Sequence, residues 1–177
     1  MTDACVFLGQ EDRILIGKNG SGEETLYVDG NGIDEHLARI SRREAKSFMT
    51  DHLGSVLNGE AAGSDHSFGP FGETTGFRLP TSDSSDPANY GFTGRSLDPE
   101  SGNYYYRART YSPGTGRFLQ KDPIGFGGGE INLYKAMRNN PLIYKDPTGL
   151  IVIDLTSGNK TSAIQSDPNY IAAMKDP

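Results

Sequence analysis

The chain lacks the residues that build disulfides, metal clusters and membrane spans. Its 177 residues include one cysteine, three histidines and no tryptophan. The single Cys5 excludes an intrachain disulfide and a cysteine-based metal cluster, and the histidines do not stand at metal-ligand spacing. No apolar run approaches the roughly 18–20 residues that cross a bilayer, and no basic-then-apolar segment opens the sequence. We therefore expect no metal, no cofactor, no membrane span and no N-terminal secretion signal.

The chain has no large excess of acidic or of basic residues. The formal net charge is −6, and residues 98–150 hold seven basic and five acidic side chains with no long basic stripe. Nucleic acid is therefore not an expected partner. The glycine run at residues 127–129 has no following Lys-Ser/Thr pair, so it does not predict a phosphate loop.

Glycine and proline are abundant, at 23 and 10 residues. Short apolar runs at 6–8, 13–16 and 25–28 are separated by glycine-rich turns, and this rhythm predicts antiparallel strands. Residues 35–46 have the residue types of a helix but no clean 3.6-residue apolar stripe. The favoured interpretation is two strands, at 37–40 and 47–50, and a helix is the alternative.

The composition divides the chain into four parts. Degenerate β-hairpins are expected over 1–79, and a Ser/Asp/Pro-rich flexible connector over 80–89. Residues 90–150 carry an aromatic run that predicts a strand–turn–strand, followed by a short helix within 131–138. Residues 151–177 form a short polar tail whose first residues can continue a strand. The expected fold class is mainly β.

One motif occurs twice. Lys121–Phe126 and Lys145–Leu150 both read K-D-P-x-G-apolar and stand 24 residues apart, while Asp98-Pro99 lies a further 24 residues upstream without the glycine. Proline restricts the preceding aspartate to extended conformations, and glycine allows a sharp turn. The simplest interpretation is a β-turn in which the aspartate caps its own backbone. The alternative is a pair of carboxylates that share a proton, as general acid–base chemistry requires.

The string from Tyr90 to Gly125, Y-G-F-T-G-R-S-L-D-P-E-S-G-N-Y-Y-Y-R-A-R-T-Y-S-P-G-T-G-R-F-L-Q-K-D-P-I-G, resembles the Rhs repeat-associated core domain. The stretch N-L-Y-K-A-M-R-N-N-P-L-I-Y-K-D-P-T-G-L at 132–150 resembles the rest of that domain. Upstream, G-I-D-E-H-L-A-R-I, T-D-H-L-G-S-V and F-G-P-F-G-E resemble the degenerate YD repeats that precede such cores.

The resemblance implies a function. Rhs proteins are large bacterial polymorphic toxins of interbacterial competition, and their YD repeats form a hollow β-shell around a C-terminal toxin. The core plugs the shell and acts as an intramolecular aspartyl protease that cuts after D-P-x-G-L. Carried over, the cut falls between Leu150 and Ile151, and the catalytic pair is Asp122 and Asp146.

Two further residues enter as supporting or alternative candidates. Asp98 is the alternative partner of Asp122, and Arg117, together with the neighbouring Lys121, is a candidate to hold the ionised form of Asp122. Both cations are also typical of a solvated surface.

The resemblance implies as partners the remainder of a larger shell or another Rhs protein, and an immunity protein for full-length relatives. It implies a bacterial cytoplasmic location for this chain and a dedicated secretion system for those relatives. The alternative hypotheses are a catalytically silent structural or interaction β module and a decayed gene remnant.

Overall fold

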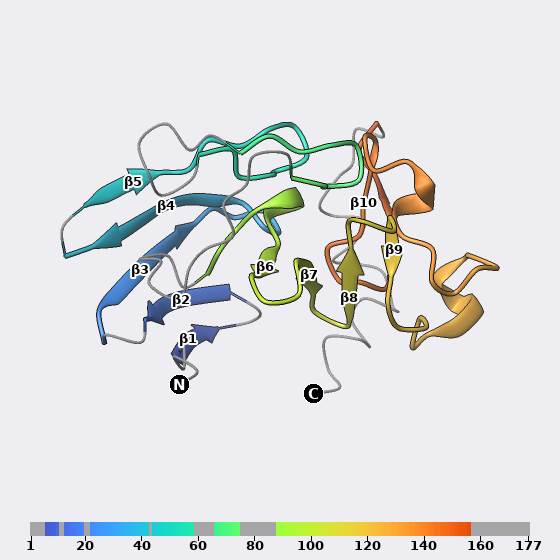
Figure 1. Cartoon of the computed structure of the whole chain (residues 1–177), viewed down its shortest axis with the longest axis horizontal. Coiled ribbons are helices and arrows are strands. Elements are labelled where there is room, and N and C mark those ends of the chain that lie inside the picture. Colours follow the sequence, from blue (N-terminus) through green and yellow to red (C-terminus); the bar gives the residue numbers. More distant parts are fainter. Residues whose placement is uncertain are drawn as a thin grey trace.

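Short apolar runs between glycine turns fold into antiparallel strands, as the sequence predicts. The computed structural model describes residues 6–10, 13–19, 22–42, 44–58, 66–74 and 88–156. The molecule is mainly β: a five-stranded sheet leads into a four-stranded sheet, and a two-stranded ribbon follows (Figure 1). Residues 80–87 of the connector predicted over 80–89, and the tail beyond residue 156, lie outside the described residues.

The first sheet runs in sequence order from β1 to β5, with all neighbours antiparallel. Its strands are β1 (Val6–Gln10), β2 (Arg13–Lys18), β3 (Glu24–Asp29), β4 (His36–Ser41) and β5 (Ala45–Ser47). The β interpretation of residues 35–57 is therefore confirmed. The second strand of that stretch begins two residues earlier than predicted, and an isolated bridge joins Thr50 to Val56.

The second sheet carries the aromatic run. Its order is β6 (Ser96–Asp98), β7 (Asn103–Tyr106), β8 (Arg109–Ser112) and β9 (Arg117–Phe118). Because side chains alternate along a strand, Tyr104 and Tyr106 point inward while Tyr105 stays 59% exposed. Tyr106 packs edge-on against Tyr111 and Phe118, which also pack edge-on against each other, and such pairs add about 0.5–1.5 kcal/mol each beyond burial.

The helix predicted within 131–138 is present only as the single 3-10 turn η3 (Met137–Asn139). All three of its residues have positive φ, which L-residues do not sustain over several helical turns. The other 3-10 turns of the described chain are η1 (Phe92–Gly94) and η2 (Gly125–Gly128). None of the described helical segments is long and apolar enough to cross a membrane.

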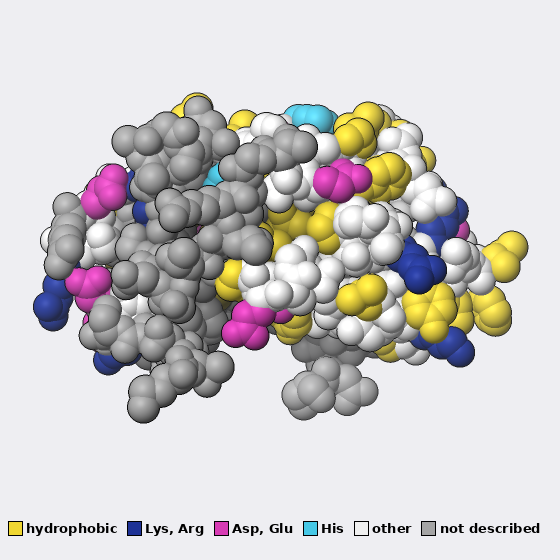
Figure 2. All heavy atoms as spheres, in the orientation of Figure 1, with side chains coloured by type: hydrophobic (Ala, Val, Ile, Leu, Met, Phe, Trp, Pro, Cys, Tyr) yellow, Lys and Arg dark blue, Asp and Glu magenta, His cyan; other side chains and the backbone are white. Residues whose placement is uncertain are grey.

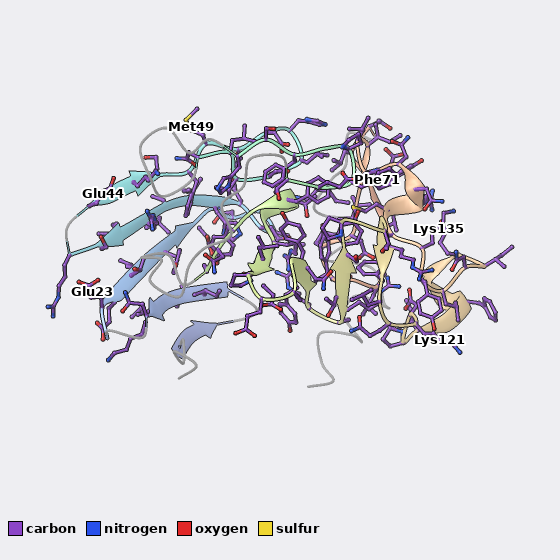
Figure 3. The ribbon with its side chains drawn as sticks, viewed as in Figure 1. Glu23, Glu44, Met49, Phe71, Lys121 and Lys135 are labelled. Atoms are coloured by element: carbon purple, nitrogen blue, oxygen red, sulfur yellow. The ribbon has the colours of Figure 1, made fainter. Side chains whose placement is uncertain are left out.

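The two sheets share a buried contact. The ring of His36 stacks on Tyr90 at 3.6 Å between centroids, and its Nε2 lies 2.9 Å from the Gly94 carbonyl oxygen. Ala88 is also buried, and its N–H donates to the Tyr27 hydroxyl at 3.0 Å. Figure 3 shows side chains crowding around the second sheet near Phe71, whereas Glu23 and Glu44 mark the opposite end of the first sheet.

The ribbon of β10 (Tyr144–Lys145) and β11 (Ile153–Asp154) closes the described chain. Its two strands flank the segment from Asp146 to Val152. The second K-D-P-x-G motif and the predicted cleavage position therefore form the loop of a hairpin, and this loop packs against the second sheet.

Candidate functional site

The repeated motif forms the same turn twice. The N–H of Gly125 donates to the Asp122 carbonyl at 3.0 Å, and that of Gly149 donates to the Asp146 carbonyl at 3.3 Å. Each carboxylate also caps its own turn: Asp122 Oδ1 accepts from the Ile124 N–H at 3.0 Å, and Asp146 Oδ1 accepts from the Leu150 N–H at 2.9 Å. The capping interpretation of these aspartates therefore describes their local geometry correctly.

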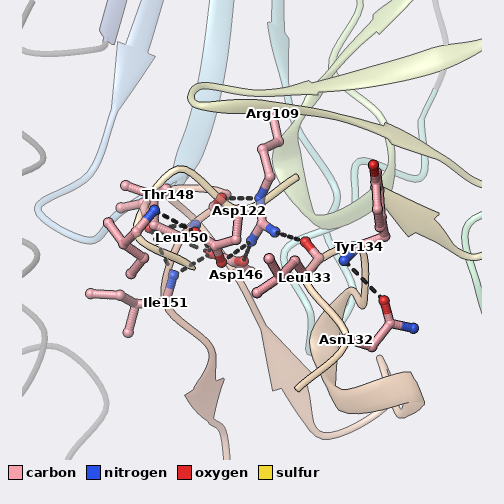
Figure 4. A network of polar contacts seen from close by, with 11 residues as sticks. Arg109, Asp122, Asn132, Leu133, Tyr134, Asp146, Thr148, Leu150 and Ile151 are labelled. Carbon is pink, nitrogen blue, oxygen red and sulfur yellow. Dashed lines mark hydrogen bonds and ion pairs between the residues drawn. The ribbon is translucent and has the colours of Figure 1, made fainter. Parts of the chain in front are cut away.

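Capping does not occupy the second oxygen of either carboxylate, and both second oxygens contact one arginine. Nη2 of Arg109 lies 3.2 Å from Asp122 Oδ2 and 3.1 Å from Asp146 Oδ2 (Figure 4). The side chains of Arg109, Asp122 and Asp146 are 3%, 9% and 0% exposed. The two aspartates predicted as a pair thus lie in one buried cluster with a single cation between them.

The remaining donors of Arg109 bind backbone carbonyls. Nε donates to the Gly149 oxygen, and Nη1 donates to the Leu133 oxygen at 3.2 Å. The guanidinium also covers the ring of Phe118, 3.7 Å from its centroid. A planar group with several fixed donors suits such a site, because lysine cannot contact four acceptors in one plane.

Asp146 contacts the peptide bond predicted for cleavage. Its Oδ1 accepts the N–H of Ile151 at 3.1 Å in addition to that of Leu150. Thr148 Oγ1 lies 3.3 Å from the same Ile151 nitrogen. The nitrogen of the Leu150–Ile151 bond is therefore held directly by one of the two carboxylates.

The segment before that bond is fixed residue by residue. Three consecutive residues at the turn between β7 and β8 donate to three consecutive carbonyls: Arg107 Nη1 to Pro147, the Ala108 N–H to Thr148 at 3.2 Å, and Arg109 Nε to Gly149. At Gly149, φ is +70° and a Cβ would stand 2.3 Å from the Tyr106 oxygen. Only glycine fits there.

Burial sets the proton affinity of the pair. Desolvation raises the pKa of Asp122, and the opposing effects of Arg109 and the Ile124 N–H are smaller. Desolvation likewise raises the pKa of the Asp146 carboxyl, against Arg109 and the two N–H donors, and the Asp122 charge raises it further. Because each charge disfavours the other, the two carboxylates titrate as a pair that retains a proton at higher pH than isolated aspartates.

The other two sequence candidates lie elsewhere. Asp98 is an exposed turn residue whose oxygens accept from the Glu100 N–H at 3.1 Å and the Ser101 hydroxyl at 2.5 Å. The Arg117 side chain is exposed on β9 and points away from the face on which Phe118 is buried. Arg109 was not among the site residues predicted from the sequence. The available signal was its position in β8, two residues before the inward-facing Tyr111, which places a cation on the buried face.

Several toxin proteins are similar to this chain. No family model matches it. Toxin subunit YenC2 of Yersinia entomophaga is 34% identical over 85% of this chain and 15% of its own length. Toxin subunit YenC1 of the same organism is 37% identical over 49% of this chain and 9% of its own length. Toxin protein Tse5 of Pseudomonas aeruginosa is 49% identical over 34% of this chain and 5% of its own length. The chain thus spans a small part of these relatives.

Solved structures share the fold. The crystal structure of TcdB2-TccC3-TEV matches 76% of this chain and 7% of its own with a TM-score of 0.57 at 22% identity. The crystal structure of TcdB2-TccC3 without the hypervariable C-terminal region matches 78% of this chain and 7% of its own, with a TM-score of 0.56 at 22% identity. At 22% identity, these matches show only that this chain shares the fold of those structures.

Proposed function

Because the chain is an Rhs-family protein with the repeat-associated core region, we propose that this core is an aspartyl protease that acts on its own chain. The bond cut is Leu150–Ile151, and the products are a core ending at Leu150 and a segment beginning at Ile151. The carboxylate pair is Asp122 and Asp146. The proposed organisation is repeat hairpins over 1–79, a connector over 80–89, the core over 90–150 and the released segment from 151.

One observation supports this proposal above the others. Asp146 Oδ1 accepts the N–H of Ile151 while its Oδ2 shares Arg109 Nη2 with Asp122. A carboxylate that only capped its turn would have no reason to share a cation with a second buried carboxylate. This contact supports the proposal, because the reaction requires two neighbouring carboxylates that share a proton and a substrate bond held next to them.

The proposed step adds one water across the amide. The water oxygen forms a bond with the Leu150 carbonyl carbon and gives a proton to the ionised carboxylate, which we assign to Asp122. The bond from that carbon to the Ile151 nitrogen then breaks, and the nitrogen takes a proton from the carboxyl that holds it, Asp146. Arg109 stabilises the negative charge of the pair without giving up a proton.

The experiment that tests the proposal is intact mass spectrometry of the purified chain. We expect the parent to lose residues 151–177, and Asp122→Asn and Asp146→Asn to lose them at least about 100-fold more slowly. Asp98→Asn, which removes the alternative partner of Asp122, is expected to be cut like the parent. A parent that stays intact contradicts the proposal.

The rate of cleavage is expected to fall as pH rises. The pair must keep one proton, and burial raises the pKa of both carboxyls, so the protonated form persists above the ordinary aspartate range of about 4 and is lost at higher pH. The measurement is the first-order rate of cleavage between about pH 4 and pH 9. A rate that increases steadily over this range would indicate hydroxide or a different base instead of the pair.

A second function is favoured by the first sheet. Leu26, Val28 and Ile40 lie on its exposed face, at 44%, 37% and 42% exposure, and β1 and β5 are edge strands in the described part of the chain. Such edges pair with other strands. We propose that this sheet joins the remainder of a larger shell or another Rhs protein in the bacterial cytoplasm. If the purified chain stays intact and its β structure is stable, this association is the function that remains.

A further inference from the structure

The segment that follows the proposed cut is held by the part of the chain that precedes it. Strand β11 pairs with β10. Beyond that pair, the Leu155 N–H donates to the Ile143 carbonyl at 2.8 Å. The Leu155 side chain packs against the buried cluster that contains the aromatic side chains of the second sheet. None of these contacts includes the Leu150–Ile151 bond, so hydrolysis of that bond leaves them in place.

The first residue of that segment has its nitrogen at two buried acceptors. The Ile151 nitrogen lies 3.1 Å from Asp146 Oδ1 and 3.3 Å from Thr148 Oγ1 (Figure 4). Both acceptor side chains are buried, and Ile151 itself is half-buried. In the uncut chain a single N–H serves both oxygens. An ammonium group has three hydrogens and can donate one to each acceptor.

The proposed cleavage creates a positive charge at this nitrogen. In that reaction Asp146 gives its proton to the nitrogen and Asp122 gains one from the water, so Asp146 ends ionised. Free α-carboxyl and α-ammonium groups have ordinary pKa values of about 3.5 and about 8. The new Leu150 carboxyl therefore passes its proton to the new amine. The products at neutral pH are a Leu150 carboxylate and an Ile151 ammonium beside the ionised Asp146.

The ammonium supplies Asp146 with a second cation. In the uncut chain Asp146 Oδ2 shares Arg109 Nη2 with Asp122, whereas Oδ1 accepts from the N–H groups of Leu150 and Ile151. After the cut, the ammonium brings a positive charge to Oδ1 while Arg109 stays at Oδ2. Charge-assisted hydrogen bonds are about twice as strong as neutral ones. Cleavage therefore strengthens a contact that already exists.

We propose that Asp146 and Thr148 form a binding site for the new amino terminus of Ile151 in its ammonium form. Strand β11 and Leu155 keep the terminus in place, and the ammonium occupies the carboxylate that the reaction used. A second peptide bond is then excluded from Asp146, so each core cuts once. This inference rests on the proposed self-cleavage and adds what becomes of its product.

The test measures how fast the Ile151 amine reacts with an acetylating reagent in the cut parent. The cut chain is treated with N-hydroxysuccinimidyl acetate, and tandem mass spectrometry locates the acetyl groups. The Ile151 amine is expected to react at least about 10-fold more slowly in the native product than in the denatured one, because a buried charge-assisted hydrogen bond must break first. The exposed Lys121 should react at similar rates in both. Equal rates at Ile151 would overturn the inference.

A matched pair of variants tests how the terminus is held. Leu155 packs against the core, whereas Thr156 is exposed and hydrogen-bonds to Asp154 within its own segment. In cut Leu155→Ala the Ile151 amine is expected to react about 10-fold faster than in the cut parent, because the smaller side chain weakens the docking. Cut Thr156→Ala should match the parent. Unchanged protection in Leu155→Ala would contradict the proposed way of holding the terminus.

A crystal structure of the cut parent provides an independent measurement. We expect the Ile151 nitrogen within about 3 Å of Asp146 Oδ1, as in a charge-assisted hydrogen bond. A terminus that points elsewhere overturns the inference, whereas self-cleavage stands because the chain has been cut. If the parent stays intact, self-cleavage fails and the inference fails with it.

Discussion

Replacing Arg109 with methionine is expected to abolish self-cleavage and to lower the free energy of unfolding by about 3–5 kcal/mol, the usual cost of removing one partner of a buried ion pair. Methionine keeps an unbranched chain over the Phe118 ring, so the loss reports the charge and its donors. Without the guanidinium, Asp122 and Asp146 are buried with no cation between them. The Gly149 and Leu133 carbonyls also lose a donor.

The loss of stability in Arg109→Met should become smaller as the pH falls. With Arg109 removed, the pKa of both carboxyls in the folded state rises further above the unfolded value, because only the backbone N–H donors still oppose the effect of burial. The folded variant then binds protons that the unfolded chain does not, so its stability increases as pH falls toward about 4. Denaturant unfolding of Arg109→Met against Arg117→Met, which removes an exposed arginine from the neighbouring strand, measures the effect. Equal midpoints for the two variants would contradict it.

Replacing Asp34 with asparagine is expected to destabilise the chain by a similar amount, about 3–5 kcal/mol. Asp34 is 4% exposed, and its Oδ1 contacts both Arg95 and Arg107, the second at 3.0 Å. Asparagine accepts its positive φ of 57° and keeps its shape, so the substitution removes the charge alone. The two arginines and the nearby Lys145 would then remain without this anion.

The Asp34 charge also has a pH signature. Burial raises the pKa of its carboxyl, but Arg95 and Arg107 together lower it more, so the folded pKa lies below the ordinary value. The contribution is complete above about pH 4 and is lost as pH falls through the folded pKa. The melting temperatures of Asp34→Asn and of the exposed-residue control Glu100→Gln should differ strongly at neutral pH and less in acid.

Cleavage should also slow in Asp34→Asn, because Arg107 joins Asp34 to the Pro147 carbonyl.

The sequence predicts the local structure of the second sheet well, and the reason is visible in its residues. The turn before Asn103 and the strand that follows it are short-range features, so they are readable without knowledge of the fold. The turn at Arg107, which divides the aromatic run into β7 and β8, was not predicted. The helix expected within 131–138 failed because its last residues adopt left-handed turns. Asparagine accepts that conformation at low cost, and the apolar residues Ala136 and Met137 enter the core from the turn.

Only part of the candidate site could be predicted from the sequence. The repeated K-D-P-x-G motif identified Asp122 and Asp146, because the same turn chemistry recurs at each. It could not show that the turns meet, since that depends on Arg109 and on the pairing of β10 with β11. Asp98 has the same Asp-Pro pair but caps an exposed turn, and it lacks both the preceding lysine and the glycine two residues after the proline that the other two motifs share. The contact of Asp146 with the Ile151 nitrogen is likewise a property of the folded chain.

The second sheet ends in a group of exposed apolar side chains beyond β9. Phe126 is 73% exposed and Ile131 is 91% exposed, and Figure 2 shows yellow side chains at the end of the molecule that these segments form. Phe126 belongs to η2, and Ile131 follows the end of this turn by three residues. The outer side of this turn is therefore exposed to solvent, whereas Gly128 on its inner side lies next to the Asp122 carboxylate.

The most direct test of self-cleavage follows two chains in one tube. Unlabelled parent is mixed with ¹⁵N-labelled Asp122→Asn chain, and intact mass spectrometry records both over time. Because Asp146 holds the scissile nitrogen of its own chain, the unlabelled parent is expected to end at Leu150 at a rate independent of concentration while the labelled variant stays whole. Cleavage of the labelled chain beside the parent, or no cleavage of either, would contradict a core that cuts itself.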